Sequence, residues 1–167
     1  TIQSLVSVNQ AAGMSIVKYT GDGSASSTVG HGLGVIPDLT IFKSSSTSDF
    51  WHFYDTASNT VMFLNASTAA TTVSGGTNGA VDIANMSSTT FGFINGSSSV
   101  NNQNGSGTNY IVYAFKSISG FSKIGSYTGV SSGVTITTGF RPSFIMVKSS
   151  SNVENWAVLD TTRGSGK

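Results

Sequence analysis

The chain contains only two prolines and only two tryptophans, and both pairs are 105 residues apart, at Pro37 and Pro142 and at Trp51 and Trp156. Each proline opens a segment that ends in Lys-Ser-Ser-Ser, and each tryptophan is followed four residues later by Asp-Thr. Across these two segments eight aligned positions are identical, with no gap. Self-similarity at a fixed separation is the signature of a repeated module. We therefore predict one complete module and a partial second copy.

The predicted module boundaries follow from two glycines. Gly13 and Gly120 each open a segment that ends in Tyr-Thr-Gly, with an offset of 107 to 108 residues. We predict three parts: residues 1–12 as an N-terminal strand, residues 13–119 as the first module and residues 120–167 as a partial second module. A half-built sandwich exposes an apolar face and open strand edges. The second module is therefore expected to be completed by further chain, by a neighbouring subunit or by the first module.

Composition predicts an all-β fold. The sequence has 30 Ser, 20 Thr, 12 Asn and 20 Gly, whereas charged residues make up only 9%, against about 25% in a typical soluble domain. Thr favours strands, and Ser, Gly and Asn favour turns. Residues 134–138 alternate between apolar and polar as a half-buried strand does, and the apolar runs 39–42 and 144–147 predict central strands covered on both faces. Short strands between frequent turn signals indicate a β-sandwich of the concanavalin or jelly-roll type.

The charge and hydrophobicity of the sequence argue against binding to nucleic acid and against membrane insertion. The net charge is +1, and the sequence has no cluster of Lys and Arg, so we expect no binding to nucleic acid. No apolar run approaches the roughly 18 residues of a membrane-spanning helix, so we expect no membrane insertion. The chain has no Cys, which leaves no thiol to act as nucleophile or metal ligand.

Residues that could carry chemistry are few. His31 and His52 are the only histidines, and neither has a second ligand at metal-binding spacing, so we predict no metal and no cofactor. Asp55 and Asp160 occupy equivalent positions before Thr, where a carboxylate typically accepts turn amides; contact with carbohydrate is the alternative. Glu154 is the only Glu, so no Glu pair for glycoside hydrolysis exists. We predict that the protein is not an enzyme.

Two further groups of residues leave alternatives open. Four aromatic side chains could stack on sugar rings, but their positions in strands favour a role in the core: Tyr19, Trp51, Tyr127 and Trp156. Four Asn-X-Ser triplets would be glycosylation acceptors in a secreted protein: Asn65, Asn85, Asn95 and Asn104. We expect Asn95 and Asn104 to be accessible, because they lie in a polar loop.

The N-terminal segment is β-prone, with Ile2, Val6 and Val8 on one face and Leu5 between them. One interpretation is that it is the last strand of a preceding repeat and has the role that residues 110–115 have in the first module. The other is that it adds as a strand to an incomplete neighbouring subunit. These four residues are our candidates for assembly.

Several strings resemble parts of a known but uncharacterised module: residues 30–37, 109–115, 120–129 and 138–148, and the Asn155-Trp and Asp160-Thr-Thr-Arg-Gly segments. This module is a repeated β-sandwich of predicted tail-fibre or head-fibre proteins of marine and freshwater bacteriophages and related metagenomic sequences. The resemblance covers residues 13–167. It implies a structural, non-enzymatic role and supplies no catalytic or binding residues.

We therefore expect a structural subunit of an extracellular or virion-associated fibre, assembled as a homo-oligomer or homopolymer by strand completion. The alternative is a lectin-like module of a phage tail protein, whose Asn-, Ser- and Gly-rich loops bind a host-surface glycan. A glycan-cleaving enzyme is a distant third.

Overall fold

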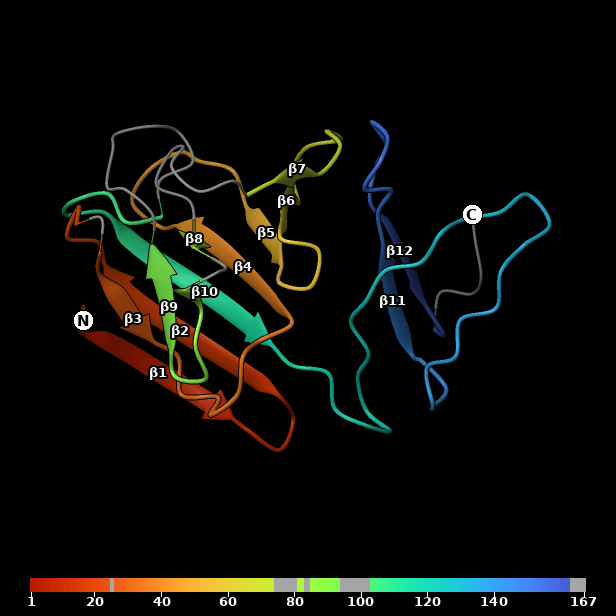
Figure 1. Ribbon diagram of the computed structural model, residues 1–167, viewed down its shortest axis with the longest axis horizontal. Coiled ribbons are helices and arrows are strands. Elements are labelled where there is room, and N and C mark those ends of the chain that lie inside the picture. Colours follow the sequence, from red (N-terminus) through yellow and green to blue (C-terminus); the bar gives the residue numbers. More distant parts are fainter. Residues whose placement is uncertain (25, 74–80, 83–84, 94–102, 163–167) are drawn as a thin grey trace.

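The computed structural model describes residues 1–24, 26–73, 81–82, 85–93 and 103–162. These residues contain no α-helix, and all their paired strands are antiparallel (Figure 1). The prediction of an all-β protein is confirmed. The strands in chain order are β1 Ser4–Asn9, β2 Met14–Thr20, β3 Thr28–Gly30, β4 Leu39–Ser44, β5 His52–Asp55, β6 Thr60–Phe63, β7 Thr71–Thr72, β8 Val81–Asp82, β9 Thr90–Phe93, β10 Asn109–Phe115, β11 Phe144–Val147 and β12 Ala157–Asp160.

Two sheets form the main body. The larger has seven strands in the order β1-β2-β10-β4-β5-β6-β7, and the smaller has three in the order β3-β9-β8. Figure 1 shows the smaller sheet in front of β2, β10 and β4. Ser15, Val17 and Tyr19 of β2 are buried while the residues between them are more exposed, because side chains of a strand alternate between its faces. The arrangement is that of a β-sandwich.

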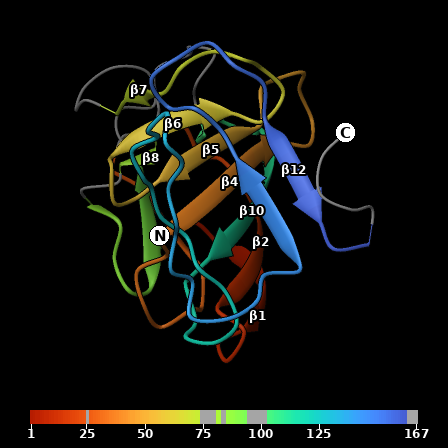
Figure 2. The ribbon, with the colours of Figure 1, turned by 90° about the vertical axis from the view of Figure 1, so that its right-hand side faces the viewer.

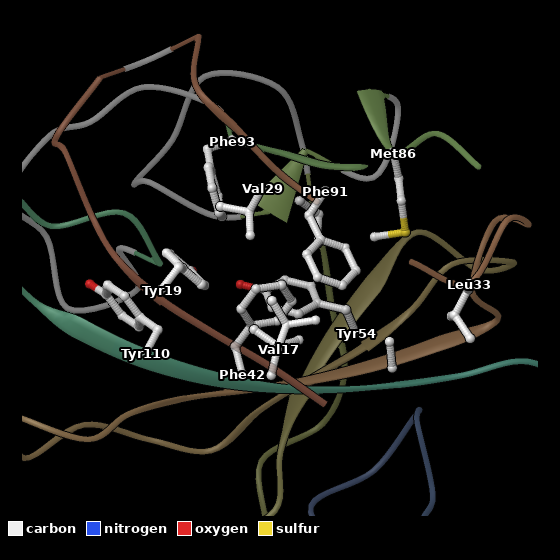
Figure 3. Packing of buried hydrophobic residues seen from close by; sticks show 13 residues of the cluster. Val17, Tyr19, Val29, Leu33, Phe42, Tyr54, Met86, Phe91, Phe93 and Tyr110 are labelled. Carbon is white, nitrogen blue, oxygen red and sulfur yellow. The ribbon is translucent and has the colours of Figure 1, made fainter. Parts of the chain in front are cut away.

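The core lies between these two sheets (Figure 3). Phe42 of β4 contacts Tyr54 of β5 and Phe91 of β9 edge-on, with ring centroids 5.7 and 5.4 Å apart. Val17 and Val29 are also fully buried. Edge-to-face packing of aromatic rings adds to the free energy gained by burying their area. These contacts hold the three-stranded sheet on the inner face of the seven-stranded one.

The remaining strands, β11 and β12, form a separate two-stranded hairpin. It packs on the outer face of the larger sheet, where Met146 and Trp156 join a cluster with Ile41 and Phe53. The ring centroids of Phe53 and Trp156 are 4.9 Å apart, and the Trp156 indole N–H donates to the Phe63 carbonyl at 2.8 Å. Figure 2 shows the hairpin from the side on which it covers the body.

Two sequence-based strand predictions are wrong. Residues 134–138 form no strand, and Val134 and Ile136 are 49% and 50% exposed. Residues 144–147 do form a strand, but not a central one covered on both faces: Phe144 is 60% exposed. Residues 134–138 have the apolar pattern but pair with no strand among the described residues, and β11 is covered on one face only, where Met146 packs on the larger sheet. The matching prediction for residues 39–42 is confirmed, since Leu39, Thr40 and Phe42 are buried.

Candidate assembly surface

The hairpins β4–β5 and β11–β12 have the same register. Leu39 pairs with Asp55 and Phe42 with His52, and the residues 105 positions later pair in the same way, from Phe144 with Asp160 to Val147 with Ala157. The backbone hydrogen bond at the open end is also repeated, from Thr56 to Asp38 and from Thr161 to Ser143, both at 3.1 Å.

The turns beside these strands match as well. Asp55 Oδ1 accepts the backbone N–H of Ala57, and Asp160 Oδ1 accepts that of Thr162, both at 3.0 Å. These are the turn hydrogen bonds predicted from the sequence, so the two carboxylates have a structural role at hairpin ends. Gly34 and Gly139, each three residues before a proline, have φ values of +76° and +85°, which residues other than glycine rarely adopt.

The two hairpins differ in what surrounds them. β4 is paired on its other edge with β10, and β5 with β6. Among the described residues no further strand pairs with β11 or β12. The inner-face residues of β4–β5 are fully buried, whereas their counterparts in β11–β12 are partly or well exposed; the pairs are Thr40 and Ile145, Phe42 and Val147, His52 and Ala157, and Tyr54 and Leu159.

The exposed face of β11–β12 is apolar. Ile145 and Leu159 are 42% and 39% exposed, and with Pro142 they line an open hollow of about 300 Å³ that also borders Arg141 and Asp160. Surfaces of this kind usually mark interaction sites. We therefore take this face, together with the open edge of β11, as the candidate assembly surface.

β1, which carries the assembly candidates from the sequence, is an edge strand of the larger sheet. It pairs with β2 of the same chain, from Ser4 with Tyr19 to Asn9 with Met14. Val6 and Val8 lie on the sandwich side, near Gly32, and are 39% and 42% exposed. Leu5 points to the other face and is 74% exposed, whereas Ile2 packs against the core and bridges to β3.

A family model described as a domain of unknown function (DUF7483) matches residues 1–167. The chain belongs to this family. No curated protein and no solved structure matches it. The match includes β1 and the β11–β12 hairpin as well as the sandwich, so both surfaces described above are parts of one family domain.

Both histidines of this DUF7483 domain are buried. His31 is buried; its Nδ1 accepts the Leu33 backbone N–H at 3.2 Å, so its Nε2 carries the proton and donates to the Ser87 carbonyl at 3.1 Å. Burial lowers the pKa of His31, although the hydrogen bond to Ser87 opposes that shift. His52 is buried with its ring stacked on Tyr54. Among the described residues no three His, Asp, Glu or Cys side chains are placed to hold a metal.

Burial places the candidate sugar-stacking residues in three settings. Tyr19 lies in the core, and its hydroxyl donates to the Gln103 carbonyl. Trp51 and Trp156 are partly buried on the outer face of the larger sheet, where Trp51 stacks on Tyr113. Tyr127 is 48% exposed and lies outside any strand, so the prediction that it packs in a core is wrong.

The accessibility predicted for Asn104 is also wrong. Its side chain is fully buried, and its amide donates to Asp22 Oδ1 at 2.9 Å and to the Ser24 carbonyl at 2.8 Å. Hydrogen bonds to Asp22, first of all from the Ser27 hydroxyl, lower the pKa of this carboxyl. Sequence reasoning missed this cluster because Asp22 and Asn104 are far apart in the chain.

The other predicted acceptors differ in setting. Asn65 is exposed, and its Oδ1 accepts the Trp51 backbone N–H at 3.0 Å, so glycosylation at Asn65 stays a prediction. Asn85 is also exposed. Asn95 lies outside the described residues. The part of the chain that the structure describes contains no helix long and apolar enough to span a membrane.

Proposed function

We propose that this chain is a structural, non-enzymatic subunit of an extracellular or virion-associated fibre, and that its copies join by β-strand completion. The observation that carries the proposal is the contrast between the hairpins. β11–β12 repeats the register and turn contacts of β4–β5, yet the face corresponding to the sandwich core is apolar and exposed. Another copy that supplied strands to this hairpin would bury that face.

The features that the two hairpins share support a further proposal, that residues 120–167 are a partial second copy of the module of residues 13–119. Registers 105 residues apart, paired Asx-type turns and paired positive-φ glycines agree with a duplication. Under this proposal, residues 1–12 form a separate N-terminal strand, and the module is a sandwich of the concanavalin or jelly-roll type.

Self-association tests the proposal. We expect light scattering after size exclusion to give masses well above the 17.2 kDa of one chain, rising with protein concentration, and negative-stain electron microscopy to show regular filaments. Ile145→Glu places a charge on the exposed face and should prevent assembly. Val130→Glu is the matched control, because Val130 is 55% exposed outside the hairpin. A mass of one chain at all concentrations would contradict the proposal.

The glycan-binding alternative stays a prediction. The loops on which it depends include residues 74–80 and 94–102, which lie outside the described residues. A glycan array probed with the assembled protein separates the two functions. Binding that persists in the Ile145→Glu variant would favour receptor recognition by a single chain.

A further inference from the structure

The backbone groups at the open edge of β11 can be identified from the end of the hairpin. The N–H of Thr161 donates to the Ser143 carbonyl at 3.1 Å, which makes Phe144 and Asp160 a non-hydrogen-bonded pair of the ladder. Bonded and non-bonded pairs alternate in antiparallel strands. The N–H and C=O groups of Phe144 and Met146 therefore point away from β12, toward the open edge.

The equivalent edge of β4 shows what such an edge accepts. Leu39 and Ile41, like Phe144 and Met146, form non-hydrogen-bonded pairs within their own hairpin, so their backbone groups point to the other edge of the strand. There they pair with Phe115 and Tyr113 of β10. Because Asn109 at the start of β10 accepts the N–H of Ser45 at 2.8 Å, these are hydrogen-bonded pairs. An antiparallel strand thus occupies the edge of β4 whose counterpart on β11 is open.

The open edge of β1 follows from the strands beside it. Lys116 donates to the Gly13 carbonyl at 2.7 Å, so Phe115 and Met14 are a non-bonded pair between β10 and β2. The backbone groups of Met14 therefore point to Asn9 of β1, and every second residue of β1 bonds to β2.

The residues between those have their backbone groups on the outer edge: Ser4, Val6 and Val8. The backbone groups of Ile2 also point to this outer edge, and its N–H donates to the Thr28 carbonyl of β3 at 2.7 Å. The edge is thus occupied at Ile2, while among the described residues no strand pairs with it from Ser4 to Val8.

We propose that β1 of a second copy of this chain adds antiparallel to the open edge of β11, with Val8 opposite Phe144 and Val6 opposite Met146. The inference rests on the proposed function and names the strand and the edge that join. Val8 precedes Gly13 by five residues, as Phe115 precedes Gly120. β1 would therefore occupy on β11 the place that β10 occupies on β4. The backbone N–H and C=O groups of Val6 and Val8 would face those of Met146 and Phe144.

Side-chain placement agrees with this register. Leu5, 74% exposed in one copy, would lie opposite Val147, on the same face as Ile145, while Val8 would cover Phe144, which is 60% exposed. Residues 1–8 and 142–147 contain no charged side chain, so no like charges meet. The partner is a second copy because β1 is bonded to β2 at the far edge of the larger sheet, whereas β11 lies over Ile41 and Phe53.

Disulfide trapping tests the register in a chain that has no cysteine of its own. Leu5 and Val147 would form a non-hydrogen-bonded pair, whose Cα atoms are about 4.5 Å apart, within the range of a disulfide. Leu5→Cys would be mixed with a size-tagged Val147→Cys chain under mild oxidation. Two further mixtures serve as controls: Leu5→Cys with Ile145→Cys, two residues out of register, and Leu5→Cys with Val153→Cys, which is 70% exposed outside the strands.

We expect the 5–147 heterodimer at about ten times the yield of either control. Equal yields, or a higher yield for 5–145, would overturn the register. If wild-type particles form but 5–147 does not cross-link, the inference fails while the proposed function stands. If no particles form, both fail.

Proline substitution gives a second test. Val6→Pro removes an N–H from the open edge of β1, where proline is tolerated, so we expect it to abolish particles and keep the wild-type far-UV circular dichroism. Ser7→Pro, the control, removes an N–H bonded to β2 and should lower the thermal midpoint. Particles formed by a folded Val6→Pro variant would overturn the inference.

Discussion

The hairpins β4–β5 and β11–β12 are alike in local geometry and unlike in environment. Both pair in the same register, and both end in a carboxylate that accepts the N–H two residues on. Phe42 is nevertheless fully buried, and its counterpart Val147 is only partly buried. The same local sequence features, proline, glycine and Asp-Thr, accompany the same hairpin geometry in both places, whereas burial depends on strands distant in the sequence.

The largest difference between the hairpins should appear in core truncations. Phe42→Ala removes a ring that contacts Tyr54 and Phe91, and we expect it to lower the free energy of unfolding by about 3–5 kcal/mol. Val147→Ala should cost less than about 1 kcal/mol. Urea unfolding of both variants measures this in unassembled protein. Equal losses would show that β11–β12 is packed as tightly as β4–β5.

The next effect concerns the contact between the hairpins. Trp156→Ala removes the packing on Phe53 and the hydrogen bond to Phe63, so we expect amide exchange in β11 and β12 to become about tenfold faster or more. Exchange in β2 and β10 should not change. Trp51→Ala, the control, removes the stacking on Tyr113. Faster exchange throughout the molecule would indicate that the hairpin and the sandwich unfold as one unit.

A smaller effect separates the open ends of the hairpins. Asp38 accepts hydrogen bonds from Lys116 Nζ at 2.5 Å and from the Ser117 N–H at 2.8 Å, whereas the counterpart of Asp38 is Ser143, which has no charge. Burial would raise the pKa of Asp38, but its hydrogen bonds with Lys116 and Ser117 outweigh burial and lower it. Asp38→Asn should cost about 1 kcal/mol at pH 7.

The same carboxylate predicts a pH dependence. Because its pKa is lower in the folded state, its stabilisation is fully present above the unfolded value of about 3.9 and is lost as pH falls through the folded value. The difference in unfolding free energy between wild type and Asp38→Asn should therefore shrink in acid. A difference that stays constant down to pH 2 would contradict this assignment. Ser143→Ala is the control, and it should change neither the unfolding free energy at pH 7 nor its decrease in acid.

The smallest effect concerns His31, which lies ahead of Pro37, whereas the residue 105 positions later, ahead of Pro142, is Ile136. Burial lowers its pKa, so folding favours the neutral ring. Stability should then be constant above the unfolded pKa of about 6.5 and decrease as pH falls below it. In His31→Gln this decrease should be absent, as measured by urea unfolding between pH 8 and pH 5. An unchanged slope would show that another group titrates there.

Sequence reasoning succeeded where the signal is local. The strand expected at residues 110–115 lies within β10, and the turn hydrogen bonds expected at Asp55 and Asp160 are present. It failed where the partner is distant. The periodicity of apolar residues does not indicate that β10 lies between β2 and β4. Val134 and Ile136 have the apolar pattern of a strand, but no strand among the described residues pairs with them. The buried amide of Asn104 depends on Asp22, on another loop.

The positions of the two tryptophans have a spectroscopic consequence. Trp51 stacks on Tyr113, and Trp156 packs at a tilt against Phe53, so both indoles lie on the outer side of the larger sheet, outside the core. Intrinsic fluorescence therefore reports the release of β11–β12 and its neighbours, while far-UV circular dichroism reports the loss of the whole sandwich. Coincident transitions are the test of two-state unfolding. In this protein a fluorescence change that precedes the dichroism change would isolate undocking of the hairpin without any added label.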